Sequence, residues 1–432
     1  MNSDTIFAPA TAPGRAGIAV VRVSGPAAGD SLCALTGKPA PGERTMVMRT
    51  LRDPVSRETI DHALVLTFSA PASFTGENVV EYHLHGSPAV LKGLLAALGA
   101  QTDHRLAQPG EFTRRAFENG KMDLTAAEAV ADLINAETAV QKAQALAQMD
   151  GALARLYDGW CARLTRGLAH LEADLDFPDE DLPEGVAAQI RSDLAALLSE
   201  IAAHMDDNRR GERLRDGVHI AVIGEPNAGK SSLVNALARR DVAIVSPEAG
   251  TTRDIIEVHM DLNGYPVILA DTAGLRPSQI GEDGQEGIES EGIRRAIQRA
   301  KDADIKLLVF NGAQLPDLNM YTLEMADDNA IVAINKMDVY DGTIPTINGQ
   351  KPVALSVRNG EGLDKLLKIL GEKTASLIGR RETPSLTRAR HREALEDCRE
   401  ALTRALTQTM SELMAEDVRL AVRGLGRITG RV

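Results

Sequence analysis

The stretch VHIAVIGEPNAGKSSLVNAL constrains the fold of this chain more than any other segment. It begins with an apolar, β-branched run, continues through a glycine-rich loop and ends in a helix-like segment. Gly224 to Ser231 match G-x-x-x-x-G-K-[ST], and the flanking strand and helix are the context that this phosphate-binding motif requires. A glycine-rich turn without a ligand is the alternative, and the agreement between loop and flanks argues against it. The sequence therefore predicts an α/β nucleotide-binding domain.

The residues of this loop have distinct predicted roles. Its glycines let backbone amides approach phosphate oxygens, and the helix N-terminus adds its positive end. We expect Lys230 to reach the β- and γ-phosphates as a catalytic group, and Ser231 to ligate Mg²⁺. The predicted nucleotide contacts in this loop are Asn227, Ala228, Gly229, Lys230, Ser231 and Ser232.

Two later segments match the γ-phosphate and Mg²⁺ elements of a GTPase. The run Gly250-Thr251-Thr252-Arg253-Asp254 supplies a threonine for Mg²⁺ and the γ-phosphate, and Thr252 is the preferred candidate. The run Asp271-Thr272-Ala273-Gly274 supplies an acid behind Mg²⁺ and a glycine amide for the γ-phosphate. Both segments follow the phosphate loop in the order that a GTPase requires.

Two further segments predict recognition of guanine. Asn335-Lys336-Met337-Asp338 follows the apolar strand AIVAI, and Asp338 can accept two hydrogen bonds from N1 and N2 of guanine. Adenine lacks that edge, so we expect GTP rather than ATP. In ALSVRNGEG, the residues placed to contact the base are Ser356, Val357 and Arg358.

Composition limits the function classes. The 432 residues suffice for two or three domains, and a hydrophobic content of 44% supports a sizeable core. The formal charge of −13 argues against a broad basic surface for nucleic acid, and leaves room for a local patch or a nucleic-acid-binding partner. Cys33, Cys161 and Cys398 are far apart and odd in number, which fits a reducing cytoplasm. We expect neither a signal peptide nor a membrane span.

The texture of the sequence predicts an α/β plus all-α architecture. Residues 1–121 have strand-like runs in GIAVVRVSG, DHALVLTF and ENVVEYHLHGS, and a helix in SPAVLKGLLAALGA. Residues 122–213 are helical, with Thr125 and Glu128 as a predicted capping box and a break at FPDEDLPEG. Residues 214–378 alternate strands and helices as in a doubly wound domain, and residues 379–432 are helical again. The simplest packing joins both helical segments into one domain, with the α/β module inserted.

Two groups of charged or titratable residues are predicted to have structural rather than functional roles. The run LTRARHRE alternates arginines with other residues and acids, and is most simply a solvated helix face. His83 and His85 fall on one face of a strand, but two ligands are too few for a metal site, so we expect packing or surface histidines.

Three longer segments resemble one known family. They are DTIFAPATAPGRAGIAVVRVSG, SFTGENVVEYHLHGSP and RLAQPGEFTRRAFENGKMDLTAAEAVADLI, and they are far more specific than the phosphate loop. They resemble signatures of the MnmE (TrmE) family of bacterial tRNA-modification GTPases, and the resemblance covers nearly the whole chain. It implies a folate-binding N-terminal domain, a split helical domain and an inserted G domain.

The resemblance also implies a function. Members act with MnmG, an FAD protein, in a heterotetramer that installs an aminomethyl or carboxymethylaminomethyl group at carbon 5 of the wobble uridine of certain tRNAs. A tetrahydrofolate derivative, 5-formyl- or 5,10-methylene-tetrahydrofolate, supplies the one-carbon unit. The N-terminal domain mediates homodimerisation, and the G domains pair across the dimer when GTP and K⁺ bind.

The resemblance suggests how GTP is hydrolysed here. The residue after DTAG is Leu275, which has no polar atom to orient water, and family members use K⁺ for charge. Asn227 matches the K⁺-ligating asparagine. The family pattern E-x-x-G-I-x-R-A puts the water-orienting role on Glu289, with Glu282, Glu286 and Glu291 as runners-up; otherwise these acids form a solvated loop face. The matched K⁺ loop comprises Ser246, Pro247, Glu248, Ala249, Gly250 and Thr251, and the ligands within it are Ser246, Glu248 and Thr251.

Family-matched folate contacts fall on Arg22, Glu81 and Lys121. An arginine and a lysine suit carboxylates, and a glutamate suits the donors of a pterin ring. The structural alternatives are a cross-strand ion pair between Arg22 and Glu81, and a merely exposed Lys121.

The sequence departs from the family in two places. PSQIGEDGQEG lengthens the loop between DTAG and the Glu289 pattern, which bears on how fast water is positioned. The printed sequence ends in GLGRITGRV, whereas family members end in Cys-x-Gly-Lys, and we expect this to affect tRNA modification more than GTP hydrolysis.

Two other function classes stay open at this point. One is a ribosome-assembly or RNA-binding GTPase of the Era or Der type, although no KH-type motif or basic appended domain is visible. The other is a non-catalytic switch that binds folate and GTP.

Overall fold

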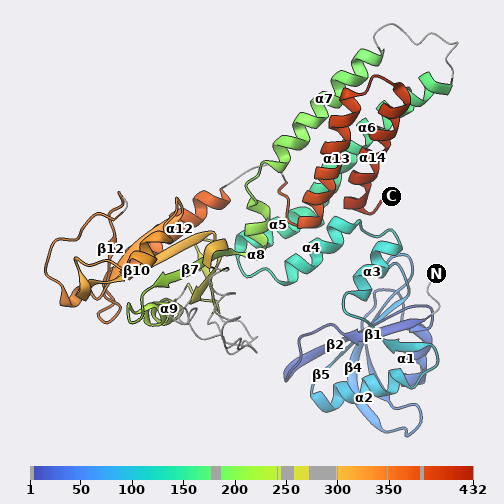
Figure 1. Ribbon diagram of the computed structural model, residues 1–432. Coiled ribbons are helices and arrows are strands. Elements are labelled where there is room, and N and C mark those ends of the chain that lie inside the picture. Colours follow the sequence, from blue (N-terminus) through green and yellow to red (C-terminus); the bar gives the residue numbers. More distant parts are fainter. Residues whose placement is uncertain are drawn as a thin grey trace, which may run out of the picture. The chain divides into compact units, whose positions relative to one another are not determined.

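The computed structural model describes residues 4–176, 186–240, 242–244, 257–271, 298, 300–347, 349–379 and 384–431 (Figure 1). The chain divides into two compact units, Met1–Ala127 and Glu128–Val432. Within the described residues, no helix is long and apolar enough to cross a membrane.

The first unit is built on a six-stranded sheet with the strand order β3-β4-β5-β2-β1-β6. One face of the sheet packs against two helices, and its core includes Val21, Val23, Tyr82, Leu32 and Leu94. The predicted strands and the predicted helix of residues 1–121 are confirmed. The elements are β1 Thr5–Pro9, β2 Ala16–Ser24, α1 Ala28–Thr36, β3 Val47–Arg52, β4 Thr59–Phe68, β5 Val79–Gly86, α2 Pro88–Gly99, β6 His104–Leu106 and α3 Glu111–Glu118.

The opposite face of this sheet is partly apolar and open. The register aligns Met48 with Leu64, Leu64 with His83, and His83 with Val20, so these side chains form one row across four strands. Met48 is 62% exposed and Leu64 is 37% exposed. Met48 and Leu64 are therefore two neighbouring apolar side chains on the face of the sheet that lies opposite the helices.

The helical segments are α4 to α8 and α13 to α14. Their bounds are α4 Leu124–Ile134, α5 Ala139–Met149, α6 Ala152–Asp176, α7 Val186–Met205, α8 Arg210–Asp216, α13 Ala389–Thr407 and α14 Ser411–Thr429. The break predicted at FPDEDLPEG lies outside the described residues.

The predicted capping box of Thr125 and Glu128 is wrong. Asp123 caps α4 instead, because its Oδ1 accepts hydrogen bonds from the backbone amides of Thr125 at 2.8 Å and Ala126 at 3.0 Å. Glu128 points elsewhere, toward arginines of α13. A capping box does start the next helix, between Thr138 and Gln141.

Helices far apart in the sequence form one bundle. α6 and α7 pack against α13 and α14 around a shared apolar core (Figure 1). This core confirms that the two helical segments join into one domain with the α/β module inserted between them. Its largest members include Tyr157, Trp160, Leu164, Leu197, Leu395, Leu402, Met414 and Leu425.

The inserted module is a doubly wound domain, as predicted. Its sheet has the order β12-β11-β10-β7-β9-β8, in which only β8 is antiparallel to its neighbour. Gly224 pairs in register with Val309, and Asp271 with Val222, so both motif residues reach the carboxyl edge of the sheet. The elements are β7 Val218–Gly224, α9 Lys230–Ala238, β8 Glu257–Leu262, β9 Tyr265–Asp271, β10 Ile305–Asn311, η2 Gly312–Gln314, α11 Met320–Glu324, β11 Ala330–Asn335, η3 Met337–Val339, β12 Val353–Ala354 and α12 Leu363–Ile378.

The interpretation of LTRARHRE as a solvated helix face is wrong. His391 is 1% exposed, and the arginines at 388, 390 and 392 each form ion pairs with acids of other elements. The sequence alone could not show this, because the partner acids precede the arginines by 180 residues or more.

Candidate nucleotide-binding site

The phosphate loop between β7 and α9 has a backbone that requires its glycines. Gly229 has a φ of 91°, and a Cβ at that position would collide with the side-chain amide of Asn335. A Cβ at Gly224 would collide with the carbonyl oxygen of Val309 on β10. Asn227 also adopts a positive φ of 65°, which asparagine tolerates better than most residues. The loop is therefore closely packed against the neighbouring strands and open toward solvent.

Lys230 lies folded over this loop. Its Nζ donates hydrogen bonds to the carbonyl oxygens of Gly224 at 2.9 Å and Glu225 at 3.0 Å. Burial lowers the pKa of Lys230, while the carboxylates of Asp271 and Glu225 act in the opposite direction. The ammonium thus sits partly desolvated above the loop, where an incoming phosphate would complete its charge balance.

Asp271 ends β9 beside this lysine and is 4% exposed. Neither carboxylate oxygen has a hydrogen-bond partner within the described residues. A buried carboxylate with both oxygens free is costly unless a cation or a metal-bound water comes to it. Together with the hydroxyl of Ser231 at the start of α9, Asp271 fits a Mg²⁺ ion, and the donor set is the hard oxygen set that this ion prefers.

The guanine-side motif holds the loop and the base pocket together. Asn335 is 3% exposed; its Nδ2 donates to the carbonyl oxygen of Ala228 at 2.9 Å, and its Oδ1 accepts from the backbone amide of Val357 at 3.1 Å. One buried side chain therefore connects the phosphate loop to the segment that backs the base.

Asp338 is held ready to accept hydrogen bonds. The hydroxyl of Ser356 donates to its Oδ1 at 2.7 Å and lowers the pKa of Asp338. Ser356 also accepts from the amide of Asn359 at 3.3 Å. The carboxylate is thus ionised and oriented, as recognition of the N1 and N2 donors of guanine requires. Lys336 and Arg358 lie beside this motif, Lys336 with a φ of 63°.

Several predicted site residues lie outside the described residues, so their roles stay predictions. They are Ser246, Pro247, Glu248, Ala249, Gly250, Thr251, Thr252, Thr272, Ala273, Gly274, Glu289 and the runners-up Glu282, Glu286 and Glu291.

In the first unit, the structure brings Arg22 and Glu81 together. They form the cross-strand ion pair that the sequence had left open, with Arg22 Nη2 2.8 Å from Glu81 Oε1. Lys121 lies near the 71–76 segment, where its Nζ donates to the carbonyl oxygen of Pro71 at 2.9 Å.

Sequence reasoning missed two aromatic residues at this place. The guanidinium carbon of Arg22 lies 5.2 Å from the ring centre of Phe74 and 5.7 Å from that of Phe112. No sequence pattern indicates this cluster, because Arg22, Phe74 and Phe112 are far apart in the chain and meet only in the fold. Aromatic faces next to an arginine and a carboxylate could bind a flat heterocycle with an acidic tail.

The two histidines of β5 have partners in the same unit. His85 Nδ1 lies 2.8 Å from Asp61 Oδ1, and His83 Nε2 lies 3.7 Å from Glu81 Oε2. His83 therefore borders the Arg22–Glu81 pair.

Comparisons with known proteins agree over nearly the whole chain. The family model of the GTP-binding protein TrmE N-terminus matches residues 5–121, and that of the MnmE helical domain matches residues 124–432. A tRNA modification GTPase MnmE of Paramagnetospirillum magneticum is 53% identical over 431 residues, which cover 100% of this chain and 96% of the relative. The protein of the same name from Parvibaculum lavamentivorans is 52% identical, over 99% of this chain and 96% of its own length.

A solved structure also matches part of the chain. The G domain of the T. maritima FeoB iron transporter is 27% identical; the match covers 37% of this chain and 98% of that one, with a TM-score of 0.26.

Proposed function

The chain belongs to the MnmE family of tRNA modification GTPases, and on that premise we propose that it couples GTP hydrolysis to modification of carbon 5 of the wobble uridine in certain tRNAs. It is a GTP hydrolase. The observation that carries the proposal is 53% identity along the entire chain. It is supported by the phosphate loop, where Lys230 folds back onto its own backbone and the buried Asp271 has no hydrogen-bond partner among the described residues.

For hydrolysis, the described residues bind and orient the nucleotide. Lys230 leaves the carbonyls of its own loop for the β- and γ-phosphates, where it balances negative charge in the transition state. Ser231 and Asp271 would hold Mg²⁺, directly or through water, and that ion would neutralise phosphate charge. Asp338 and Asn335 fix the base, so the γ-phosphate reaches the same position in each turnover.

Many GTPases have a water-orienting glutamine at the position of Leu275, whose side chain has no polar atom. We further propose that K⁺ and Glu289 together take over the role of that glutamine. Asn227, with its positive φ, stands in the exposed part of the phosphate loop where it is free to ligate a monovalent ion. A cation there would balance charge between the β- and γ-phosphates, as an arginine finger does. The remaining proposed ligands come from Ser246 to Thr251, and Glu289 would orient the attacking water.

The first unit is proposed to bind a tetrahydrofolate derivative and to form the homodimer. Arg22, Glu81 and Lys121 supply charge and hydrogen bonds, and Phe74 and Phe112 add aromatic surface. The open, partly apolar face of the sheet supports a dimer contact. In the cytoplasm, the dimer would act with an MnmG-type FAD protein, which would bring tRNA to a chain that is itself acidic.

The hydrolysis mechanism is tested by GTP turnover in KCl and in NaCl at equal ionic strength, for the wild type, Glu289→Ala and the loop control Glu282→Ala. We expect turnover to need K⁺, to collapse in Glu289→Ala and to survive in Glu282→Ala. A K⁺-dependent rate that Glu289→Ala leaves intact would move the water-orienting role to another acid. Turnover that ignores K⁺ would remove the role of Asn227 and favour a binding switch.

Folate binding is tested by calorimetry with 5-formyl-tetrahydrofolate. Arg22→Ala should weaken binding by about tenfold or more, because it removes a charged partner of the ligand. Arg49→Ala, on the edge strand β3, is a matched control that should bind like the wild type. Absence of binding to the intact protein would refute this part and leave the GTPase assignment standing.

The two family models account for residues 5–121 and 124–432, which favours the MnmE family over a GTPase of the Era or Der type.

A further inference from the structure

The chain crosses twice between the helical bundle and the inserted domain, and the two crossings touch. The outgoing crossing runs from Met205 to Gly217, and the described residues of the returning one are Gly379 and 384–389. Gly211, inside α8, lies so close to Leu386 that a Cβ would collide with the Leu386 carbonyl oxygen. A Cβ at Gly379 would collide with the guanidinium of Arg210. The two crossings are thus closely packed, backbone against backbone at Gly211 and Leu386, and backbone against side chain at Gly379 and Arg210.

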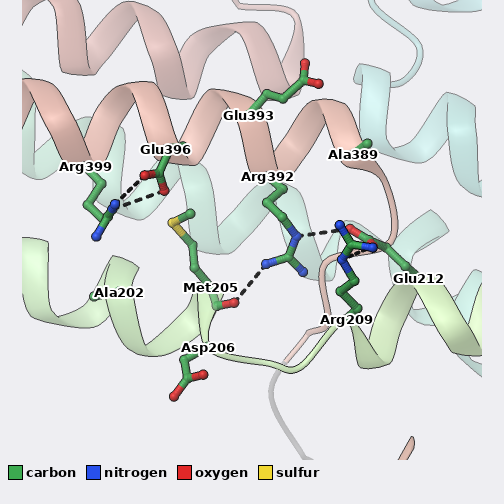
Figure 2. Close-up of a pocket in the computed structure, with 10 residues that line it drawn as sticks. All are labelled: Ala202, Met205, Asp206, Arg209, Glu212, Ala389, Arg392, Glu393, Glu396 and Arg399. Atoms are coloured by element: carbon green, nitrogen blue, oxygen red, sulfur yellow. Dashed lines mark hydrogen bonds and ion pairs between the residues drawn. The ribbon is translucent and has the colours of Figure 1, made fainter. Parts of the chain in front are cut away.

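Arg392 of α13 binds three successive parts of the outgoing crossing. Its guanidinium donates to the carbonyl oxygen of Met205 at 2.9 Å, to Asp207 Oδ1 at 2.7 Å and to Glu212 Oε1 at 3.1 Å. Figure 2 shows the contacts with Met205 and Glu212, and it shows Arg209 next to Glu212. These partners are the end of α7, the link to α8, and α8 itself. Arg392 therefore connects α13 of the bundle to the end of α7, to the segment that follows α7, and to α8.

Helix α8 is attached to the nucleotide-binding sheet. Leu214 packs against the core of that sheet, and Arg213 Nε lies 2.6 Å from Asp304 Oδ1. Asp304 Oδ2 accepts from the backbone amide of His219 at 3.0 Å. His219 belongs to β7, the strand whose other end opens into the phosphate loop. A shift of β7 against its neighbours would therefore act on α8, and through Glu212 on Arg392.

The residues that precede Arg392 bind a different element. Arg390 Nη2 lies 2.7 Å from Glu128 Oε2, and His391 Nε2 lies 3.0 Å from the same oxygen. Arg388 Nη2 lies 2.6 Å from Asp132 Oδ1. Both acids are on α4, which starts at Leu124. Four side chains among residues 388–392 thus connect the sheet-bound α8 to α4 through ion pairs.

The same place holds several buried polar atoms without hydrogen-bond partners in the described part of the chain. They are Thr387 Oγ1, Arg388 Nε, His391 Nδ1 and Asp207 Oδ2. Arg388 Nε is 3.5 Å from Glu128 Oε2, an ion-pair distance without hydrogen-bond geometry. Buried polar groups are rarely left unpaired, so their concentration here indicates an arrangement that a small shift could re-pair.

We propose that residues 387–392 form a coupling element with two arrangements of ion pairs, which transmits the nucleotide state of the inserted domain to the bundle and to α4. The proposal rests on GTP binding at the phosphate loop and is independent of folate, K⁺ and any partner. An exchange of partners among matched charges can separate two arrangements of similar free energy, which is what a conformational switch requires.

The protein contains its own reporter for this element. Trp160 is the only tryptophan in the sequence, and its ring centre lies 5.4 Å from that of His204 and 5.6 Å from that of Tyr157. His204 directly precedes Met205, whose carbonyl Arg392 binds, and Tyr157 contacts His391 at a ring distance of 6.4 Å. Rearrangement of residues 387–392 should therefore change the emission of Trp160.

The test compares Trp160 emission of the full chain with GDP and with a non-hydrolysable GTP analogue, alongside calorimetry of both nucleotides. The wild type should give different spectra with the two nucleotides. Arg392→Gln should lose about half or more of that difference while its nucleotide affinities stay within about twofold of the wild type. Arg399→Gln, on the same helix, changes an exposed arginine whose ion pair among the described residues is with neighbouring Glu396, and it should behave as the wild type.

Two further variants protect the test against simple unfolding. Glu212→Gln keeps the size of the side chain and an acceptor for Arg392, and it should reduce the difference less than Arg392→Gln does. Gly211→Ala favours the helix locally but wedges the crossings apart, so it should shift the GDP spectrum itself. Identical wild-type spectra with both nucleotides, or a full difference in Arg392→Gln, would overturn the proposal. If the wild type bound neither nucleotide, that result would instead count against the GTPase assignment.

Discussion

The phosphate-loop edge and the crossing between bundle and inserted domain are two charged regions of the same unit, and they are built in opposite ways. At the loop edge, Lys230 turns back onto its own backbone and Asp271 has no hydrogen-bond partner within the described residues. At the crossing, Glu128 and Arg392 are each bound by two or more side chains. Charged groups without hydrogen-bond partners indicate a site that binds a ligand. Charged groups that are paired with one another hold secondary-structure elements together, or let those elements exchange ion-pair partners.

Lys230→Ala attacks the region of unmatched charge and should give the largest effect. We expect kcat to fall by about 10²–10³-fold, because a preorganised cation at the phosphates is lost. Phosphate release under saturating GTP measures this, and the unfolding midpoint should stay near that of the wild type. A large loss of stability would mean that Lys230 is a structural residue, and would break the comparison.

Glu128→Ala attacks the region of matched charge and should act on stability. It leaves Arg390 and His391 without their carboxylate, and we expect a loss of about 3 kcal/mol in the free energy of unfolding. Glu396→Ala removes an acid on α13 whose ion-pair partner within the described residues is exposed Arg399, and should cost less than about 0.5 kcal/mol. Urea titration of both variants compares the two costs, and equal costs would refute the role of Glu128.

Asp338→Asn sharpens the contrast by changing specificity rather than stability. The amide can no longer accept two hydrogen bonds, so affinity for GTP should fall by about tenfold to a hundredfold. Affinity for xanthosine triphosphate should rise, since xanthine offers a carbonyl oxygen at C2. Calorimetry with both nucleotides measures the exchange. Unchanged preference for GTP would show that Asp338 does not contact the base.

Acid titration should give the smallest and most gradual effect. Burial acts to raise the pKa of Glu128, but hydrogen bonds from His391 and Arg390 bring it down to about 2, from an ordinary 4.5. Its stabilising contribution is therefore complete above pH 4.5 and is lost as the pH falls toward 2. Unfolding free energies between pH 5 and 3 should decline less steeply in Glu128→Gln than in the wild type. Equal slopes would mean that Glu128 has an ordinary pKa in the folded chain.

The parts that the sequence predicted are those encoded by neighbouring residues. Gly224, Lys230 and Asn335 were recognisable because each belongs to a motif of consecutive residues, the phosphate loop or the guanine motif. Each motif also follows an apolar, β-branched strand, as such motifs require. The doubly wound sheet and the joined helical segments followed from the same local patterns. The resemblance to a known family then supplied Arg22, Glu81 and Lys121, of which Arg22 and Glu81 pair across two strands.

The parts that the sequence could not predict depend on distant partners. Asp123 rather than Thr125 caps α4, and Glu128, the other residue of the predicted capping box, binds Arg390, which lies 262 residues later. The arginines among residues 388–392 were predicted to lie on a solvated helix face because the sequence does not show their distant acidic partners. Phe74 and Phe112 were missed for a similar reason, since nothing local shows that both rings meet Arg22.

The contact between Gly211 and Leu386 has a consequence for how the chain is made. The bundle cannot form until α13 and α14 have left the ribosome, because they supply part of its core. The apolar faces of α6 and α7 therefore stay exposed while the G domain is synthesised. Once the G domain has folded, it brings Gly211 and Leu386 together. The bundle then closes a short loop instead of one of roughly 170 residues, which saves about 3 kcal/mol of loop entropy. The inserted enzyme thereby acts as the template on which the second half of its host domain assembles.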